Sequence, residues 1–246
     1  MSEPYSAIHP VKQSDARQQW PHEAERGPKP IMTKRAITVL LALLAIAGCA
    51  FLLLRKTAER AEQVATDASQ ALGLRAGAEV SQLLSDKGAV AILGLETVTG
   101  QAPTYMTLVD VLTRTLKAHH IKVATVRLVP GGLSRLMLGS GLSGQDYRQF
   151  LDECANANAI VSLVGPPALP VEELQALQAN RPPLIVVDMF GVVKGPALRA
   201  MVEGNAVALA ILARSAAEVA QQQPPPPDLF DRYYRILRQG SPAGGK

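Results

Sequence analysis

Three hydrophobic patterns follow one another along the chain. Residues 1–35 are polar, contain five prolines and show no sustained period, which predicts a disordered N-terminal tail. Residues 36–54 (AITVLLALLAIAGCAFLLL) carry no charge over 19 positions. A helix of that length is roughly 28 Å long and matches the hydrocarbon core of a bilayer, so this run predicts a transmembrane helix. From residue 88 onward, short apolar runs alternate with amphipathic stretches, which is typical of a folded domain.

The apolar run has a second interpretation. Residues 46–49 (IAGC) resemble a lipobox, in which Cys49 would carry a lipid. The charged region ahead of the run is longer than that of a usual signal peptide, and the run continues past the cysteine as AFLLL. These two features favour a membrane span, and lipidation of Cys49 remains the alternative.

Basic residues near the span predict its orientation. Residues 16–35 contain five Lys/Arg and residues 55–74 contain three. Because cytoplasmic flanks carry the excess of basic residues, we expect a cytoplasmic N-terminus in the inner membrane and a periplasmic or extracytoplasmic C-terminal domain.

The part of the chain after the span divides into three predicted segments. Residues 55–77 are rich in helix formers and predict a helical stalk that ends at Gly73 and Gly77. Residues 78–222 predict an α/β domain. Residues 223–246 contain four consecutive prolines and an amphipathic helix over 228–240, which either docks on the domain or serves as a partner motif.

Strand-like and helix-like runs alternate within the domain. The expected strands are 89–95, 122–129, 159–165 and 184–190, with 198–203 as a short fifth, and the expected helices are 104–119, 144–158, 171–180 and 204–222. This alternation predicts a doubly wound parallel sheet of four to five strands, a Rossmann-like or flavodoxin-like layer.

Charge and cysteine content exclude several function classes. The formal net charge of +4 divides evenly, with +2 before the span and +2 after it, so there is no basic stripe for nucleic acid. Cys49 and Cys154 fall in unrelated segments, which argues against a disulfide, and neither belongs to a cluster that would bind zinc. We therefore expect no nucleic-acid partner and no metal.

One glycine string matches a cofactor motif by its letters alone. Residues 139–144 (GSGLSG) fit G-x-G-x-x-G, but no strand opens directly into them and the next strand ends without an acidic residue. A loop into the helix at 144–158, capped by Ser143, explains the string better, so we expect no cofactor. His119 and His120 are neighbours rather than an i, i+4 pair, which favours a structural position at a helix end.

Candidate site residues follow the predicted strands, because ligands gather at the carboxyl ends of parallel strands. Glu96 and Thr97 follow the first strand, and Asp188 lies in the fourth. Two carboxylates at one edge are compatible with acid–base chemistry, with ligand contact, or with purely structural roles. The sequence alone leaves these alternatives open.

Residues 88–190 resemble the N-terminal lobe of type 1 periplasmic binding proteins and the related sugar-responsive repressors. The likeness rests on AVAILGL leading to Tyr105, on QFLDECANANAIVSLVG and on RPPLIVVDMFG. It implies a non-enzymatic binding domain whose ligand contacts are Glu96, Thr97, Tyr105 and Asp188. Too little chain follows residue 204 for a second lobe, so a homodimer would supply the second wall of the cleft.

A weaker likeness is to the SGNH hydrolases, but residues 94–97 lack their Asp and Ser. A degenerate or active hydrolase of that kind is the second alternative. The sequence thus predicts a single-pass membrane protein that presents a non-enzymatic domain to a small molecule or a protein partner. The alternative is a structural subunit of a cell-envelope complex.

Overall fold

The computed structural model describes residues 34–96, 102–131, 142–154 and 156–239. The elements follow in the order α1 (Lys34–Leu83), β1 (Ala89–Leu95), α2 (Pro103–Ala118), β2 (Lys122–Val129), α4 (Gly144–Glu153), β3 (Ala159–Ser162), α5 (Val171–Gln178), β4 (Leu184–Asp188), α6 (Gly195–Glu203), β5 (Leu209–Ala213), α7 (Ala216–Ala220), α8 (Leu229–Tyr233) and β6 (Tyr234–Arg238). Residues 1–33 of the expected disordered tail and the first three residues of the glycine string lie outside the described residues, and Lys34 and Arg35 begin α1. The chain divides into two compact units, and the boundary lies between Leu53 and Leu54.

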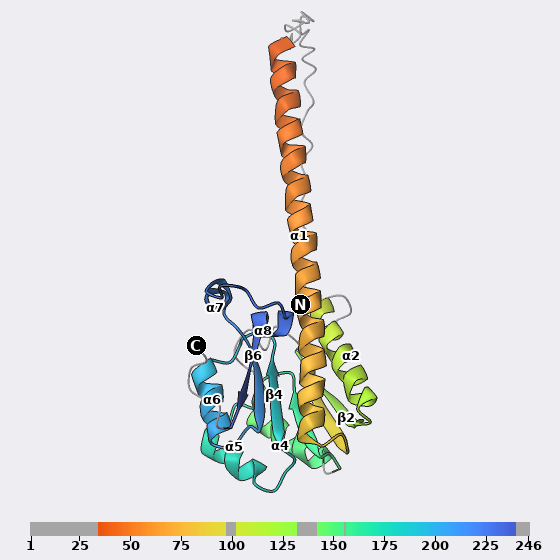
Figure 1. The fold of residues 1–246 in the computed structure, drawn as a ribbon, viewed down its shortest axis with the longest axis vertical. Helices are drawn as coiled ribbons and strands as arrows, with labels where there is room; N and C mark the ends of the chain where they lie inside the picture. The colour runs from red at the N-terminus through yellow and green to blue at the C-terminus, as the bar shows by residue number, and fades with distance from the viewer. Residues whose placement is uncertain (1–33, 97–101, 132–141, 155, 240–246) are drawn as a thin grey trace, which may run out of the picture. The chain divides into compact units, whose positions relative to one another are not determined.

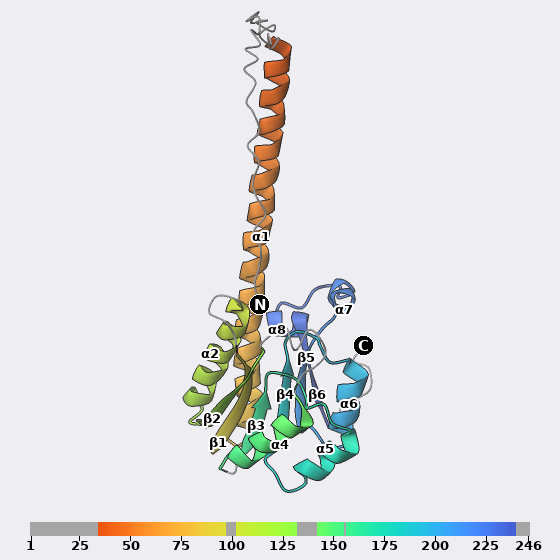
Figure 2. The same ribbon diagram turned by 180° about the vertical axis from the view of Figure 1, so that it is seen from behind.

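A six-stranded sheet forms the centre of the second unit, in the order β2-β1-β3-β4-β5-β6. The first five strands are parallel and β6 pairs antiparallel with β5. Residues 54–83 of α1 and helix α2 cover one face, and α4, α5 and α6 cover the other (Figures 1 and 2). The predicted fold class, a doubly wound α/β layer, is confirmed.

Helix α1 has a different character in each unit. Its side chains in the apolar run are exposed from Leu41 to Leu54. By length and composition it is the one helix within the described residues that is apolar enough to cross a membrane. Within the second unit, Ala68, Leu72, Ala76 and Val80 recur every four residues and are buried in the core. This spacing places one helix face on the sheet.

Gly73 and Gly77 lie inside α1, and the prediction that they end the helix is wrong. A Cβ on Gly73 would lie 2.9 Å from the Val111 Cβ, and one on Gly77 would lie 2.6 Å from the Thr115 Cγ2. Glycine is therefore needed here for the close approach of α1 to α2. The chain instead turns after Leu83, where Ser85 and Asp86 adopt positive φ angles.

The last third of the domain differs from the prediction. Residues 198–203 belong to helix α6 rather than a fifth strand, and 204–222 contains β5 and the short α7 rather than one long helix. The cause is that β5 is buried on both of its faces, so its residues are apolar without alternation. An alanine-rich apolar run of this kind fits a helix and a buried strand equally well.

The C-terminal segment docks on the domain, but not as the expected single helix. Its first part forms α8, capped by the Asp228 carboxylate, and its second part forms β6. Tyr234 and Leu237 of β6 are buried. The amphipathic pattern over 228–240 therefore covers a helix-to-strand transition, and the pairing with β5 satisfies the backbone groups of that strand.

One smaller prediction is confirmed. The Ser143 hydroxyl accepts a hydrogen bond from the Asp146 backbone N–H at 3.0 Å and caps α4. Cys49 and Cys154 are both free, with no disulfide between them. Burial raises the pKa of the Cys154 thiol to about 11, so this thiol stays protonated and packs as an apolar group.

Candidate functional site

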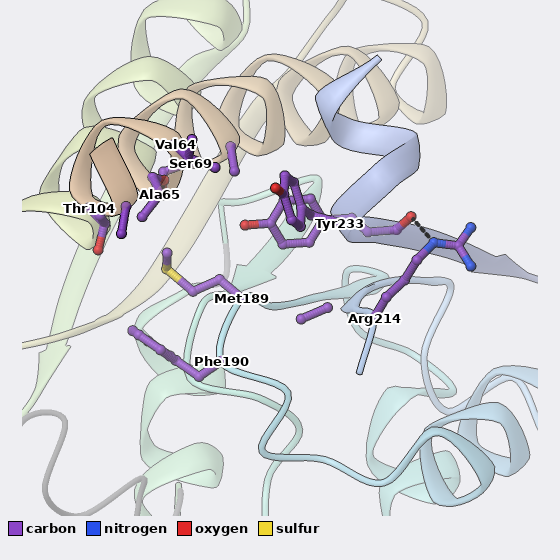
Figure 3. A pocket seen from close by; sticks show the side chains of 12 residues that line it. Val64, Ala65, Ser69, Thr104, Met189, Phe190, Arg214 and Tyr233 are labelled. Carbon is purple, nitrogen blue, oxygen red and sulfur yellow. Dashed lines mark hydrogen bonds between the residues drawn. The ribbon is translucent and has the colours of Figure 1, made fainter. Parts of the chain in front are cut away.

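A cavity of about 380 Å³ lies at the carboxyl edge of the sheet, where strands β4 and β5 end (Figure 3). Its volume falls in the range of roughly 300–1,000 Å³ that is usual for small-molecule sites. The walls come from α1, the first turn of α2, the segments that follow β4 and β5, and the α8–β6 junction. The lining residues are Ala61, Val64, Ala65, Ala68, Ser69, Thr104, Met189, Phe190, Ala213, Arg214, Tyr233 and Tyr234.

Helix α1 forms the longest wall. Val64 and Ala65 are exposed, and Ala68 and Ser69 are buried where the helix meets the core. The Ser69 hydroxyl donates a hydrogen bond to the Ala65 carbonyl at 2.8 Å. Since that hydroxyl is satisfied within its own helix, this wall presents a mainly apolar surface.

The segment after β4 supplies the opposite wall, and Asp188 holds it in place. The Asp188 carboxylate accepts hydrogen bonds from the Val192 N–H at 3.1 Å and the Val193 N–H at 2.9 Å. This arrangement turns the chain back directly after the strand and presents Met189 and Phe190 on the α1 side (Figure 3). Gly191 sits in the turn with φ +64°, a conformation that favours glycine.

Tyr105, a buried residue of α2, packs against the same wall. Its ring stacks on Phe190 with centroids 6.4 Å apart, and its hydroxyl accepts a hydrogen bond from the Leu95 N–H at 2.6 Å. Burial raises the pKa of Tyr105 to about 12, partly opposed by that hydrogen bond. The side chain is 1% exposed, so it acts as a neutral packing group.

The α8–β6 junction closes the third side. Arg214 donates from Nε to the carbonyl oxygens of Asp231 at 3.1 Å and Tyr234 at 3.0 Å, which ties the end of β5 to this junction. Burial raises the pKa of Tyr234 to about 12, so its phenol stays protonated at neutral pH. The ring centroids of Tyr234 and Phe230 lie 5.7 Å apart.

Of the predicted ligand contacts, Tyr105 and Asp188 support a wall of this cavity without lining it. Glu96 is exposed and its backbone N–H bonds to the Val129 carbonyl. Thr97 lies outside the described residues. Tyr105 and Asp188 are engaged in the internal bonds given above, so each positions the wall that carries Met189 and Phe190.

Sequence reasoning missed the α1 wall and the Tyr233–Tyr234 wall. The sequence predicts residues 55–77 as a helical stalk and residues 228–240 as one continuous helix. The four-residue recurrence of Ala68, Leu72, Ala76 and Val80 was the available signal, since it marks a helix with one buried face.

The described lining of the cavity is mainly apolar. Within the described ranges, no group of three or more His, Cys, Asp or Glu side chains is arranged to hold a metal ion. The His119 Nδ1 lies 3.1 Å from the Asp86 carboxylate, an exposed pair at the opposite edge of the sheet. The cavity offers apolar surface with a few hydroxyl groups.

No protein-family model matches the chain, and no curated protein sequence does. Solved structures similar to it include AraP, an arabinose-binding protein from Geobacillus stearothermophilus, at 19% identity and a TM-score of 0.42, covering 58% of this chain and 45% of that one. Another is XylFII, at 16% identity and a TM-score of 0.47, covering 70% and 61%.

A third is an ABC-transporter periplasmic solute-binding protein from Actinobacillus succinogenes with bound D-allose, at 15% identity and a TM-score of 0.42, covering 58% and 47%. The first and third of these structures are named as binding proteins. The chain spans less than two thirds of the length of each of them.

Proposed function

We propose that this chain is a membrane-anchored, non-enzymatic binding protein whose small-molecule ligand occupies the cavity between α1 and the ends of β4 and β5. The observation that carries the proposal is the position of the cavity at the carboxyl edge of a parallel sheet. Loops at that edge are where doubly wound folds bind ligands. The proposal assigns no bond-making step to the site.

The apolar part of α1 anchors the protein in the inner membrane. The excess of basic residues before it favours a cytoplasmic N-terminus and an extracytoplasmic domain. A reporter enzyme fused after Lys246 tests this orientation. Activity restricted to reporters that work outside the cytoplasm supports it, and activity restricted to cytoplasmic reporters contradicts it.

Asp188 and Tyr105 serve the site as positioning residues in this proposal. They fix the turn that carries Met189 and Phe190, through the two backbone N–H bonds and the stacked ring. Glu96 follows β1 at the same edge and is exposed, so it is available to a ligand that extends beyond the cavity. Thr97 remains a proposed ligand contact.

Thermal unfolding of the full chain in nanodiscs tests the proposal. The panel contains sugars, nucleosides, amino acids, polyols and compounds with a hydrocarbon chain. A ligand at a hundred times its dissociation constant stabilises the fold by about 2.7 kcal/mol, so we expect a shift of roughly 5–10 °C for a domain of this size.

Two tryptophan variants locate the binding site. Ala65→Trp places an indole from an exposed helix position into the cavity, and we expect it to abolish the thermal shift. Ala58→Trp is the matched control, because Ala58 lies two turns earlier on the same helix face and outside the lining. A shift that survives in Ala65→Trp, or no shift with any compound, contradicts the proposal.

A second candidate function is a structural subunit of an envelope complex or a homodimer. The observation that favours it is strand β2, an edge strand on which Val126 and Leu128 are 54% and 52% exposed. Exposed apolar side chains on an edge strand mark a pairing surface. Sedimentation equilibrium tests the homodimer: a dimer that Val126→Lys dissociates supports it, and a monomer contradicts it.

A further inference from the structure

We propose that the ligand of the carboxyl-edge cavity is a hydrocarbon chain, such as the acyl chain of a lipid. This inference rests on the proposed function and names its ligand class. Three observations carry it: the chemistry of the walls, the state of their polar atoms, and the place where the cavity lies along α1.

The described lining residues are mainly apolar, and none of them has an acidic or amide side chain. The described lining consists of alanines, a valine, a methionine and aromatic rings, with Ser69, Thr104 and Arg214 as its other members. A sugar site holds several hydroxyl groups through polar groups that both donate and accept hydrogen bonds, and leaving those hydroxyls unpaired is unfavourable. This lining therefore favours a ligand with few polar groups.

Two polar atoms of the lining are already engaged in hydrogen bonds within the protein. The Ser69 hydroxyl donates to the Ala65 carbonyl, and the Arg214 Nε donates to two carbonyl oxygens at the α8–β6 junction. Tyr234 is 6% exposed and presents a neutral phenol. Binding a hydrocarbon chain leaves each of these hydrogen bonds intact.

Met189 gives the cavity an adaptable wall. Its side chain points toward α1 on the side of Ala65 and Thr104 (Figure 3). A thioether with three rotatable bonds packs against irregular apolar shapes, which suits a flexible chain rather than a rigid ring.

The cavity begins close to the end of the apolar run. Ala61, the first lining residue, follows Leu54 by seven residues of continuous helix, a rise of about 10 Å. Val64, one turn further along, is an exposed apolar residue of the same wall. The apolar run and the first lining residue are thus close in the sequence, so the proposal takes the bilayer as the source of the hydrocarbon chain.

Photolabelling of the full chain in nanodiscs tests the ligand class. One arm uses a fatty acid with a diazirine at the chain end, and the other uses a phospholipid with the same diazirine chain. After irradiation, mass spectrometry of the peptides locates the label. Labelling of residues 36–54 reports delivery of the probe, and we expect additional label on residues 61–69 and 189–190.

The tryptophan variants supply the controls. Ala65→Trp is expected to reduce the label on residues 189–190 by about tenfold or more, equivalent to loss of one decade in affinity. Ala58→Trp is expected to leave it unchanged. Label from the fatty acid alone identifies a free chain as the ligand, and label from the phospholipid identifies a bilayer lipid; both support the hydrocarbon class.

Label confined to residues 36–54 in both arms overturns the inference. If a polar compound then still raises the melting temperature of the wild type and not of Ala65→Trp, the binding function stands and only the ligand class is wrong. If no compound does, the proposed function fails as well.

Discussion

Asp188 is the residue on which the shape of the cavity depends most directly. It is 4% exposed and its carboxylate accepts the N–H groups of Val192 and Val193. In Asp188→Ala both N–H groups lose their partner, and we expect the free energy of unfolding to fall by about 1–3 kcal/mol. Chemical denaturation of the full chain measures this change.

Asp152→Ala is the control for that variant. Asp152 is 74% exposed and pairs with Arg181, so its loss is expected to change the stability by less than about 1 kcal/mol. Equal stabilities for the two alanine variants would show that Asp188 does not hold the turn.

Buried tyrosines predict how stability changes at high pH. Burial raises the pKa of Tyr105 from 10.0 to about 12, and that of Tyr234 likewise. Their contribution is fully present below pH 10 and is lost as the pH rises toward 12, because the unfolded chain releases these protons first. The free energy of unfolding should fall by about 1.4 kcal/mol per pH unit for each group in that window.

Unfolding monitored by circular dichroism between pH 8 and 12 checks this expectation. Tyr234→Phe removes one titrating phenol, so its stability should fall less steeply than that of the wild type above pH 10. A variant with the wild-type slope would contradict the assignment.

The sequence reveals the chemistry of single residues but not their partners. The Ser143 cap was predictable because a helix cap is a local arrangement of a few residues. The bonds of Asp188 run to residues 192 and 193, and their direction depends on how the chain turns after β4. A carboxylate at a strand end was therefore identified, but its role in shaping a wall was not.

Among the elements, α1 and α2 pack closely enough for a single substitution to test their contact. A methyl group on Gly77 would fall within 2.6 Å of the Thr115 side chain. In an open helix, Gly→Ala stabilises by about 1 kcal/mol, whereas overpacking destabilises by about 1–3 kcal/mol. We expect overpacking to dominate, so Gly77→Ala should lower the melting temperature.

Gly48→Ala is the control, because a Cβ at Gly48 meets nothing within 4 Å. It should leave the melting temperature of the domain unchanged. A rise in melting temperature for Gly77→Ala would mean that the helices separate without loss and that their close approach is dispensable.

Elements whose apolar runs are clearly bounded were predicted correctly, and elements whose runs fit two periods were not. Strands β1 and β2 lie where the sequence placed them, since turn residues bound each run clearly. β5 and β6 were predicted as helix because an alanine-rich run and an amphipathic run fit both periods. Their pairing is a long-range contact, which local pattern does not report.

For the whole molecule, α1 continues from the apolar run into the core of the domain. Leu72 and Ala76 are fully buried, and Arg238 of β6 forms an ion pair with Glu79. A chain that begins at residue 78 lacks this layer, and burying one leucine alone is worth about 2–5 kcal/mol. We expect it to lose cooperative unfolding, whereas a chain that begins at residue 54 keeps it.

Thermal melts of these two truncated chains measure the difference. Cooperative unfolding of the shorter chain at the melting temperature of the longer one would show that α1 is a separable stalk. The sequence favoured a separable stalk because residues 55–77 are rich in helix formers and polar residues. The buried face of Ala68, Leu72, Ala76 and Val80 is a weak signal among them.

Hydrogen exchange of the full chain in nanodiscs tests the binding site most directly. Exchange is compared with and without the compound that most raises the melting temperature. The account predicts slower exchange in residues 61–69 of α1 and in residues 189–193, with no change in α4 and α5 on the other face of the sheet. Protection centred on α4 and α5, or none at all, would contradict a ligand site between α1 and the ends of β4 and β5.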